Sequence, residues 1–498
     1  MLRKAIAPLF LLIISAACAQ TPEAPAAEDA VSHDALLRRV KDRLLLFPPD
    51  ERATLLIHLV NARPDDQSSE AGELTLEIFH LTRELRSIER MDVEAKALMA
   101  YSRPDSAGAL KLLPLMEIST SPGNGYSFRE KAAGRVFKRF LDDHPDEIVR
   151  VRDTMRMMGE NGIFPFHAAA SVVRREARRS QPQAAEIVRD AVKYYSRSPR
   201  THFFDMEFAS FMVESAKYAP AAITKEGLRP LVTAILNMHG EMPAAWGSSF
   251  AEPEKPGTHR GAAEAVLASL LPLLQSVDPE WAMRLEQEHP ALASARFKNG
   301  RKAKSAAAEL FSVIADPEDE PDDRTMPQSA LNEIHALTAE DGEKALRIRA
   351  GIQDASWRAA AGADIAVMMN SINPQRANRL LEEAERQAKR SADPQNKLRI
   401  TAALGHAYLK LRRPEAFAAA LARMFRLADE TFARFSHEAP KCAWASLPGA
   451  RELAPLTREA ATYAPQMVLE QINAMQAPLL QTHLLISMME GMQAKPEQ

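Results

Sequence analysis

Apolar residues recur every three or four positions along most of the chain after residue 33. The clearest stripes lie at Leu74, Ile78, Leu81 and Leu85, and at Phe204, Phe208 and Phe211. A period near 3.6 residues places such side chains on one side of an α-helix, whereas a strand would alternate. No convincing alternating run occurs. The pattern therefore predicts an all-α protein built from about two dozen short helices.

Acidic residues followed by proline separate these helical stretches. The segments 143–146, 278–280 and 393–395 read DHPD, DPE and DPQ. An acidic side chain at the N-cap accepts hydrogen bonds from free backbone N–H groups, and proline at the first helical position loses none. We expect a helix to begin at each segment. The excess of proline (33) over glycine (19) agrees with many helix starts.

A repeated offset indicates how so many helices pack. Three pairs of residues are separated by 39 positions: Asp354 and Asp393, Ala366 and Gly405, and Ala377 and Ala416. A chain of 498 residues would ordinarily divide into several cores. An array of helical hairpins avoids that limit because each hairpin packs only against its neighbours. The sequence thus predicts an α-solenoid of stacked helical hairpins.

The segment 403–429 resembles a tetratricopeptide repeat. Leu404, Gly405 and Tyr408 match the spacing of the first helix of that repeat, and Ala377 and Ala384 match small positions of the second helix in the preceding unit. The resemblance covers residues 354–429. It implies a right-handed superhelix whose concave surface binds peptides or proteins. It also implies packing roles for Gly405, Tyr408, Ala377, Ala384 and Ala416.

The resemblance has clear departures. The turn between paired helices is one residue shorter than in the family, Thr401 replaces an early tryptophan, and the 39-residue offset exceeds the family period of about 34 residues. HEAT-like packing is equally compatible with the remaining hairpins. The resemblance implies neither catalysis nor a particular ligand.

The N-terminus is typical of an exported bacterial protein. Arg3 and Lys4 precede an apolar run at 6–14, and small residues then lead to Cys18. We interpret residues 1–19 as a signal peptide and 20–32 as a flexible tether. Two processing routes remain open: lipidation of Cys18 after a lipobox, or ordinary cleavage before Gln20. The expected location is the periplasm or, through a lipid anchor, the outer membrane.

Composition divides the remaining chain into two arrays. The segment 241–260 is rich in glycine and proline, so we place a linker there. It separates an N-terminal helical-hairpin array at 33–240 from a C-terminal array at 261–498. Such a segment also fits an insertion between hairpins, which solenoids tolerate.

Few residues of the sequence are candidates for catalysis or for metal binding. The weak metal candidates are Met238, His239 and Met242, whose thioethers and imidazole suit Cu(I). Motifs for nucleotide binding or covalent catalysis are absent from the sequence. We therefore expect no cofactor, no metal and no catalytic residue. The formal net charge is −3, which argues against a nucleic-acid partner.

One basic run stands apart. Arg174, Arg175, Arg178 and Arg179 follow helical spacing around Glu176. Such a face is either simply solvated or binds an anionic lipid, a glycan or an acidic peptide.

The sequence as a whole predicts an envelope scaffold that binds a protein or peptide. The alternative is a helical envelope enzyme or binding protein that acts on a glycan or a small ligand.

Overall fold

The computed structural model describes residues 31–62, 68–118, 124–197, 202–237, 262–289, 326–435 and 449–493. Within these ranges every regular element is helical, with 22 α-helices and four short 3-10 turns. The prediction of an all-α protein with about two dozen helices is confirmed. The chain divides into a terminal unit (residues 1–46, 334–439 and 445–498) and a central unit (47–333 and 440–444).

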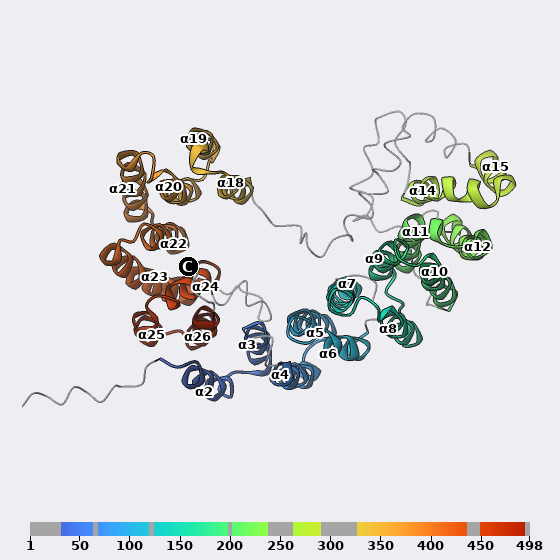
Figure 1. Ribbon diagram of the computed structural model, residues 1–498, viewed down its shortest axis with the longest axis horizontal. Coiled ribbons are helices and arrows are strands. Elements are labelled where there is room, and N and C mark those ends of the chain that lie inside the picture. Colours follow the sequence, from blue (N-terminus) through green and yellow to red (C-terminus); the bar gives the residue numbers. More distant parts are fainter. Residues whose placement is uncertain are drawn as a thin grey trace, which may run out of the picture. The chain divides into compact units, whose positions relative to one another are not determined.

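The central unit contains twelve of the described α-helices (Figure 1). They are α3 (Pro49–Asn61), α4 (Ser68–Leu81), α5 (Ser87–Tyr101), α6 (Ser106–Leu112), α7 (Asn124–Asp143), α8 (Ile148–Glu160), α9 (Phe166–Glu176), α10 (Gln181–Tyr195), α11 (His202–Ser215), α12 (Ala221–Asn237), α14 (Ala262–Val277) and α15 (Pro279–Glu288). The 3-10 turns η2 (Thr82–Glu84), η3 (Leu113–Leu115) and η4 (Ala216–Tyr218) extend three of the connections.

These helices form two rows. In the first row α3, α5, α7, α9 and α11 each contact the next member, and α11 contacts α14. In the second row α6, α8, α10 and α12 do the same. Each helix therefore packs against nearby helices of the sequence, as expected where hairpins stack on one another.

The terminal unit combines both ends of the described chain. Its helices are α2 (His33–Leu44), α19 (Gly342–Gly351), α20 (Ala355–Met369), α21 (Pro374–Arg390), α22 (Pro394–Lys410), α23 (Pro414–Phe435), α24 (Ala450–Ala461), α25 (Pro465–Ala474) and α26 (Pro478–Gln493). The helix α18 (Met326–His335) spans the division, and η5 (Ala339–Asp341) precedes α19. Contacts join α20, α22, α24, α26 and finally α2 into one row.

This division differs from the two arrays expected on either side of 241–260. The helix α14 follows that segment in the sequence, yet it contacts α11 and α12, which precede it. The glycine- and proline-rich composition therefore marks an interruption between packed helices and not the division between units. The helix α2 lies in the terminal unit, although the sequence suggested that it opens the N-terminal array.

Two acidic N-caps, Asp278 and Asp393, begin helices as the sequence predicted, and Asp354 has the same role. Asp278, Asp354 and Asp393 cap α15, α20 and α22, and their carboxylates accept bonds from backbone N–H groups two or three residues later. The expectation for 143–146 is wrong. Asp143 ends α7, and the following helix begins at Ile148 with no side-chain cap. Ser106 donates a hydrogen bond of 2.7 Å to Asp143, which gives this carboxylate a different partner.

Aromatic residues fill the core between α9, α10 and α11. Phe208 and Phe211 are at most 1% exposed, which confirms the predicted apolar face of α11. Phe208 stacks on Tyr195 with ring centroids 3.9 Å apart, and Phe166 contacts both rings. Large buried rings contribute strongly to stability, so this cluster holds the first and second rows together.

Candidate functional site

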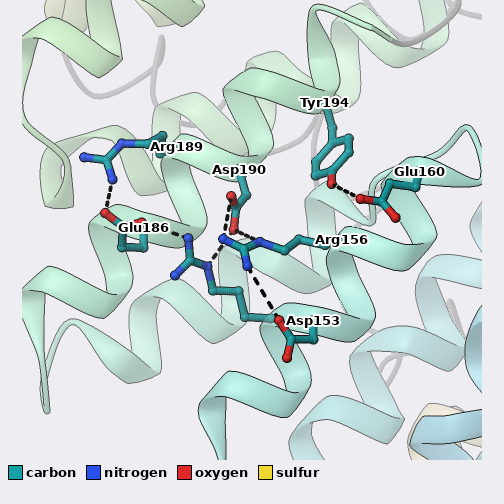
Figure 2. Close-up of polar contacts among 8 residues, drawn as sticks. Asp153, Arg156, Glu160, Glu186, Arg189, Asp190 and Tyr194 are labelled. Carbon is teal, nitrogen blue, oxygen red and sulfur yellow. Dashed lines mark hydrogen bonds and ion pairs between the residues drawn. The ribbon is translucent and has the colours of Figure 1, made fainter.

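A cluster of charged side chains joins α8 and α10 of the second row (Figure 2). Asp190 of α10 accepts hydrogen bonds from Arg152 at 2.6 Å and from Arg156 at 2.9 Å, both on α8. Its side chain is only 8% exposed. A buried carboxylate between two guanidinium groups forms strong, charge-assisted hydrogen bonds. The cluster thus fixes the register of α8 against α10.

More exposed groups surround this centre. Glu186 accepts a bond of 2.8 Å from Arg152 and also pairs with Arg189. Burial alone would raise the pKa of Glu186, but the bonds from the two arginines outweigh it and lower that pKa. Asp153 lies 3.6 Å from Arg156. Because acids and bases match here, the cluster leaves little net charge for an external ligand.

Tyr194 contributes a packing contact to the same interface. Its hydroxyl donates to Glu160 at 3.1 Å, and burial followed by this bond raises the pKa of Tyr194. A Cβ at Gly159 would lie 2.7 Å from the Tyr194 ring. The glycine therefore gives the tyrosine ring room between α8 and α10.

The arginine run at 174–179 begins in the last turn of α9 and continues into the turn that follows it, and its members have different partners. Arg175 pairs with Asp142 at 2.5 Å, and Arg179 pairs with Asp146 at 2.7 Å. These two arginines connect the end of α9 and its following turn to the end of α7 and the turn after α7. Arg174 points elsewhere and lies 3.6 Å from Glu214 of α11. The sequence grouped all four arginines on one face, whereas three of them pair with acidic residues of neighbouring segments.

A buried carboxyl pair lies in the first row of the central unit. Glu130 of α7 accepts a hydrogen bond of 2.9 Å from the backbone N–H of Ala168, near the start of α9. Glu207 of α11 is 1% exposed, and neither carboxyl oxygen has a hydrogen-bond partner in the structure. Burial, and then the nearby Glu130, raise the pKa of Glu207 well above its usual range. Burial therefore favours the neutral form of the Glu207 carboxyl over the charged form.

A carboxyl with a raised pKa beside a second carboxyl resembles the pairs that catalyse acid–base chemistry. Glu130 is only 3% exposed, however, and Glu207 is less exposed still. Protein atoms cover both groups, so a substrate does not reach them in this conformation. We assign the pair no catalytic role.

In the terminal unit, Gly405 and Tyr408 both lie in helix contacts. Gly405 is buried, and a Cβ there would lie 2.9 Å from Leu456 of α24 and 3.1 Å from Met424 of α23. Tyr408 is 6% exposed and donates a hydrogen bond of 2.5 Å to Glu385 of α21. Burial and this bond raise the pKa of Tyr408.

The predicted small positions are less uniform. Ala377 and Ala384 of α21 are at most 1% exposed. Ala416 of α23 is only partly buried, whereas Ala420 is 5% exposed and lies nearer to Gly405. The 39-residue offset thus places Ala416 one helical turn away from the close contact.

A contact between the two ends of the described chain was not predicted. The helix α2 packs against α26, with Leu36 and Val40 at most 3% exposed. Arg43 donates a hydrogen bond of 2.8 Å to Gln481, and Arg39 donates to Asn473 at 2.5 Å. Nothing local in the sequence connects residues more than 400 positions apart, so only the folded arrangement identifies this interface.

Several candidates from the sequence lie outside the described residues. They are Cys18, Met238, His239 and Met242. In the part of the chain that the structure describes, no group of three or more His, Cys, Asp or Glu residues is placed to hold a metal ion. In that same part, no helix combines the length and apolar character needed to cross a membrane.

The fold and contacts define an all-α protein whose helices stack in rows. Comparison with known proteins adds nothing more specific, since the chain matches no family model, no curated protein and no solved structure.

Proposed function

We propose that this chain is a helical-repeat scaffold of the bacterial cell envelope that binds a protein or peptide partner. The row-wise contact between successive helices of the central unit carries the proposal. Such rows repeat a similar surface from one hairpin to the next, and extended surfaces of this kind suit long partner segments. The resemblance of 354–429 to tetratricopeptide repeats supports a right-handed solenoid in the terminal unit.

The buried charged groups of the central unit also support a binding role, because they contact other parts of the fold. The Asp190 cluster joins two helices, and the Glu130–Glu207 pair is covered. These groups serve the fold, and they give no open site at which a substrate would meet a catalytic side chain. Recognition then depends on the solvent-facing stripes of the helices.

The envelope location rests on residues 1–19, with Cys18 as the proposed lipidated residue. The test is metabolic labelling of the full-length chain with a clickable palmitate analogue, followed by cell fractionation. Label on the wild type and its loss in Cys18→Ser support the lipoprotein route. An unlabelled protein that begins at Gln20 in the periplasm supports ordinary cleavage. A full-length protein in the cytoplasm contradicts export.

The scaffold function is tested by capture. Intact cells are treated with a cleavable crosslinker, and the full-length protein is isolated in mild detergent. A stoichiometric protein partner is the expected result. Recovery of the protein alone, in folded and monodisperse form, contradicts a stable scaffold role.

A further inference from the structure

The helix α2 is the last member of the row formed with α20, α22, α24 and α26, although it comes first in the sequence. Leu36, Val40 and Leu44 lie at positions i, i+4 and i+8 of α2 and are at most 3% exposed. Arg38 and Lys41 lie on the opposite side of the helix and are exposed. The helix α2 is therefore amphipathic and covers α26 with one apolar stripe.

The surface that α2 covers is made by α26 and by the end of α25. All residues of α26 from Leu480 to Met489 are at most 8% exposed, and α24, α25 and α2 each contact this helix (Figure 1). Asn473 of α25 and Gln481 of α26 accept hydrogen bonds from Arg39 and Arg43 of α2. We call the side of α26 that α2 covers, together with Asn473, the α2-binding surface. Without α2, this surface would present apolar side chains beside two amide acceptors.

The attachment of α2 is suited to release. The helix has 12 residues, a length at which an isolated helix is marginal in water, so its helical form depends on docking. Arg39 and Arg43 bond to neutral amides, whereas the arginines of α8 form ion pairs with Asp190. Hydrogen bonds between two charged groups are stronger. Leu45 and Leu46, which follow α2, are 67% and 80% exposed, so their side chains add little packing to the attachment.

We propose that α2 is an internal competitor for the α2-binding surface, and that an amphipathic helix of the partner protein takes its place. This inference rests on the scaffold function. The contacts of α2 define the chemistry of the partner helix: aliphatic residues at i, i+4 and i+8 to cover α26, and hydrogen-bond donors at i+3 and i+7 to meet Asn473 and Gln481. The α2-binding surface becomes available for recognition when α2 detaches.

Competition within one chain sets how tightly the surface is closed. Because α2 belongs to the same chain, it competes at an effective concentration on the order of millimolar. A helix supplied in solution therefore binds the wild type weakly, and it binds more tightly once the chain's own α2 no longer docks. Exchange of α2 between two copies of the chain would make the same contacts and lose this intramolecular advantage. A helix of another protein is thus the favoured occupant.

The test measures binding of a fluorescein-labelled peptide of residues 33–46 to the purified full-length chain by fluorescence anisotropy. In the chain, Val40→Asp places a charge within the apolar stripe and detaches α2, which faster hydrogen exchange in α2 verifies. The matched control Ala35→Asp adds the same side chain on the exposed side of α2. We expect the peptide to bind the Val40→Asp chain at least about tenfold more tightly than the wild type or the control.

A second pair of variants locates the peptide on the surface. Asn473→Arg, added to Val40→Asp, places a like charge against Arg39 of the peptide and should weaken binding at least about fivefold. Ala474→Arg adds the same charge at the next exposed position and should weaken binding less than about twofold. Arg43→Glu, which removes the bond to Gln481, replaces Val40→Asp if circular dichroism shows that the latter disturbs the fold.

The other outcomes overturn the inference. Equal affinity of the peptide for the wild type and for a chain with detached α2 shows that α2 does not compete for its site. Equal weakening by Asn473→Arg and Ala474→Arg places the peptide elsewhere. A wild-type dimer in light scattering that Val40→Asp converts to a monomer assigns the surface to a second copy. If the envelope partner is captured equally by the Val40→Asp chain with and without Asn473→Arg, the scaffold function stands and this inference fails.

Discussion

The Asp190 cluster allows a quantitative test of how the second row is held together. Asp190→Ala removes the carboxylate that accepts bonds from Arg152 and Arg156. Removing one partner of a buried ion pair typically costs about 3–5 kcal/mol. The two arginines are 20% and 38% exposed and regain some hydration. We therefore expect a loss of about 2–3 kcal/mol.

Hydrogen exchange is the suitable assay because stacked helices do not necessarily unfold in one step. A loss of 2–3 kcal/mol corresponds to exchange about 30- to 150-fold faster in peptides from α8 and α10. Glu186→Ala is the matched control, since it removes another bond to Arg152 on the same helix. Glu186 is 36% exposed, so its loss should cost at most about 1 kcal/mol, or about fivefold in rate. Equal acceleration by both substitutions, or none by Asp190→Ala, would refute this account of the cluster.

Three further predictions concern other contacts. Gly491→Ala should destabilise the terminal unit by about 3 kcal/mol in urea denaturation, since the new Cβ would lie 1.9 Å from the Arg458 carbonyl oxygen. Gly351→Ala is the control, because a Cβ at that position would meet no atom within 4 Å. Val40→Asp should release α2 and accelerate exchange in α26; unchanged α26 peptides would contradict this. Glu207→Gln should raise the thermal midpoint increasingly from pH 5 to 8, and parallel pH curves would contradict this.

The sign of the Glu207 prediction follows from linkage. The folded state raises the pKa of this carboxyl, so folding is favoured most below the unfolded pKa of about 4.3. That contribution is lost as the pH rises toward the folded pKa, because the unfolded chain releases the proton first. Glutamine has no proton to release, so the variant lacks this loss.

Local sequence patterns predicted where helices lie better than they predicted which helices pack together. The stripe at Phe208 and Phe211 and the caps Asp278 and Asp393 depend on residues a few positions apart, and these predictions agree with the structure. The failed start at 143–146 shows the limit of such patterns, since Asp143 bonds to Ser106 of another helix. Predicting an N-cap from neighbouring residues takes no account of a hydrogen-bond partner on another helix.

Several polar contacts between helices share one separation in the sequence. Arg156 and Asp190, Tyr194 and Glu160, and Arg349 and Glu383 are each 34 residues apart. In each pair, this separation links a helix to the second helix after it in the sequence. Searching the sequence for opposite charges 33 or 34 residues apart would have paired Arg175 with Asp142 and Arg179 with Asp146. It would not have found the α2–α26 contact, which crosses most of the chain.

The α2–α26 contact also bears on the order in which the protein folds. The apolar side of α2 emerges early in synthesis, whereas its partner is the last described helix. The apolar side of α2 therefore stays without its partner until almost the whole chain has been synthesised; it consists of Leu36, Val40 and Leu44. The central unit lies between the two partners in the sequence and has time to form first. A nascent chain that stops before α26 would keep an uncovered apolar stripe, and such a stripe is what chaperones and proteases recognise in incomplete proteins.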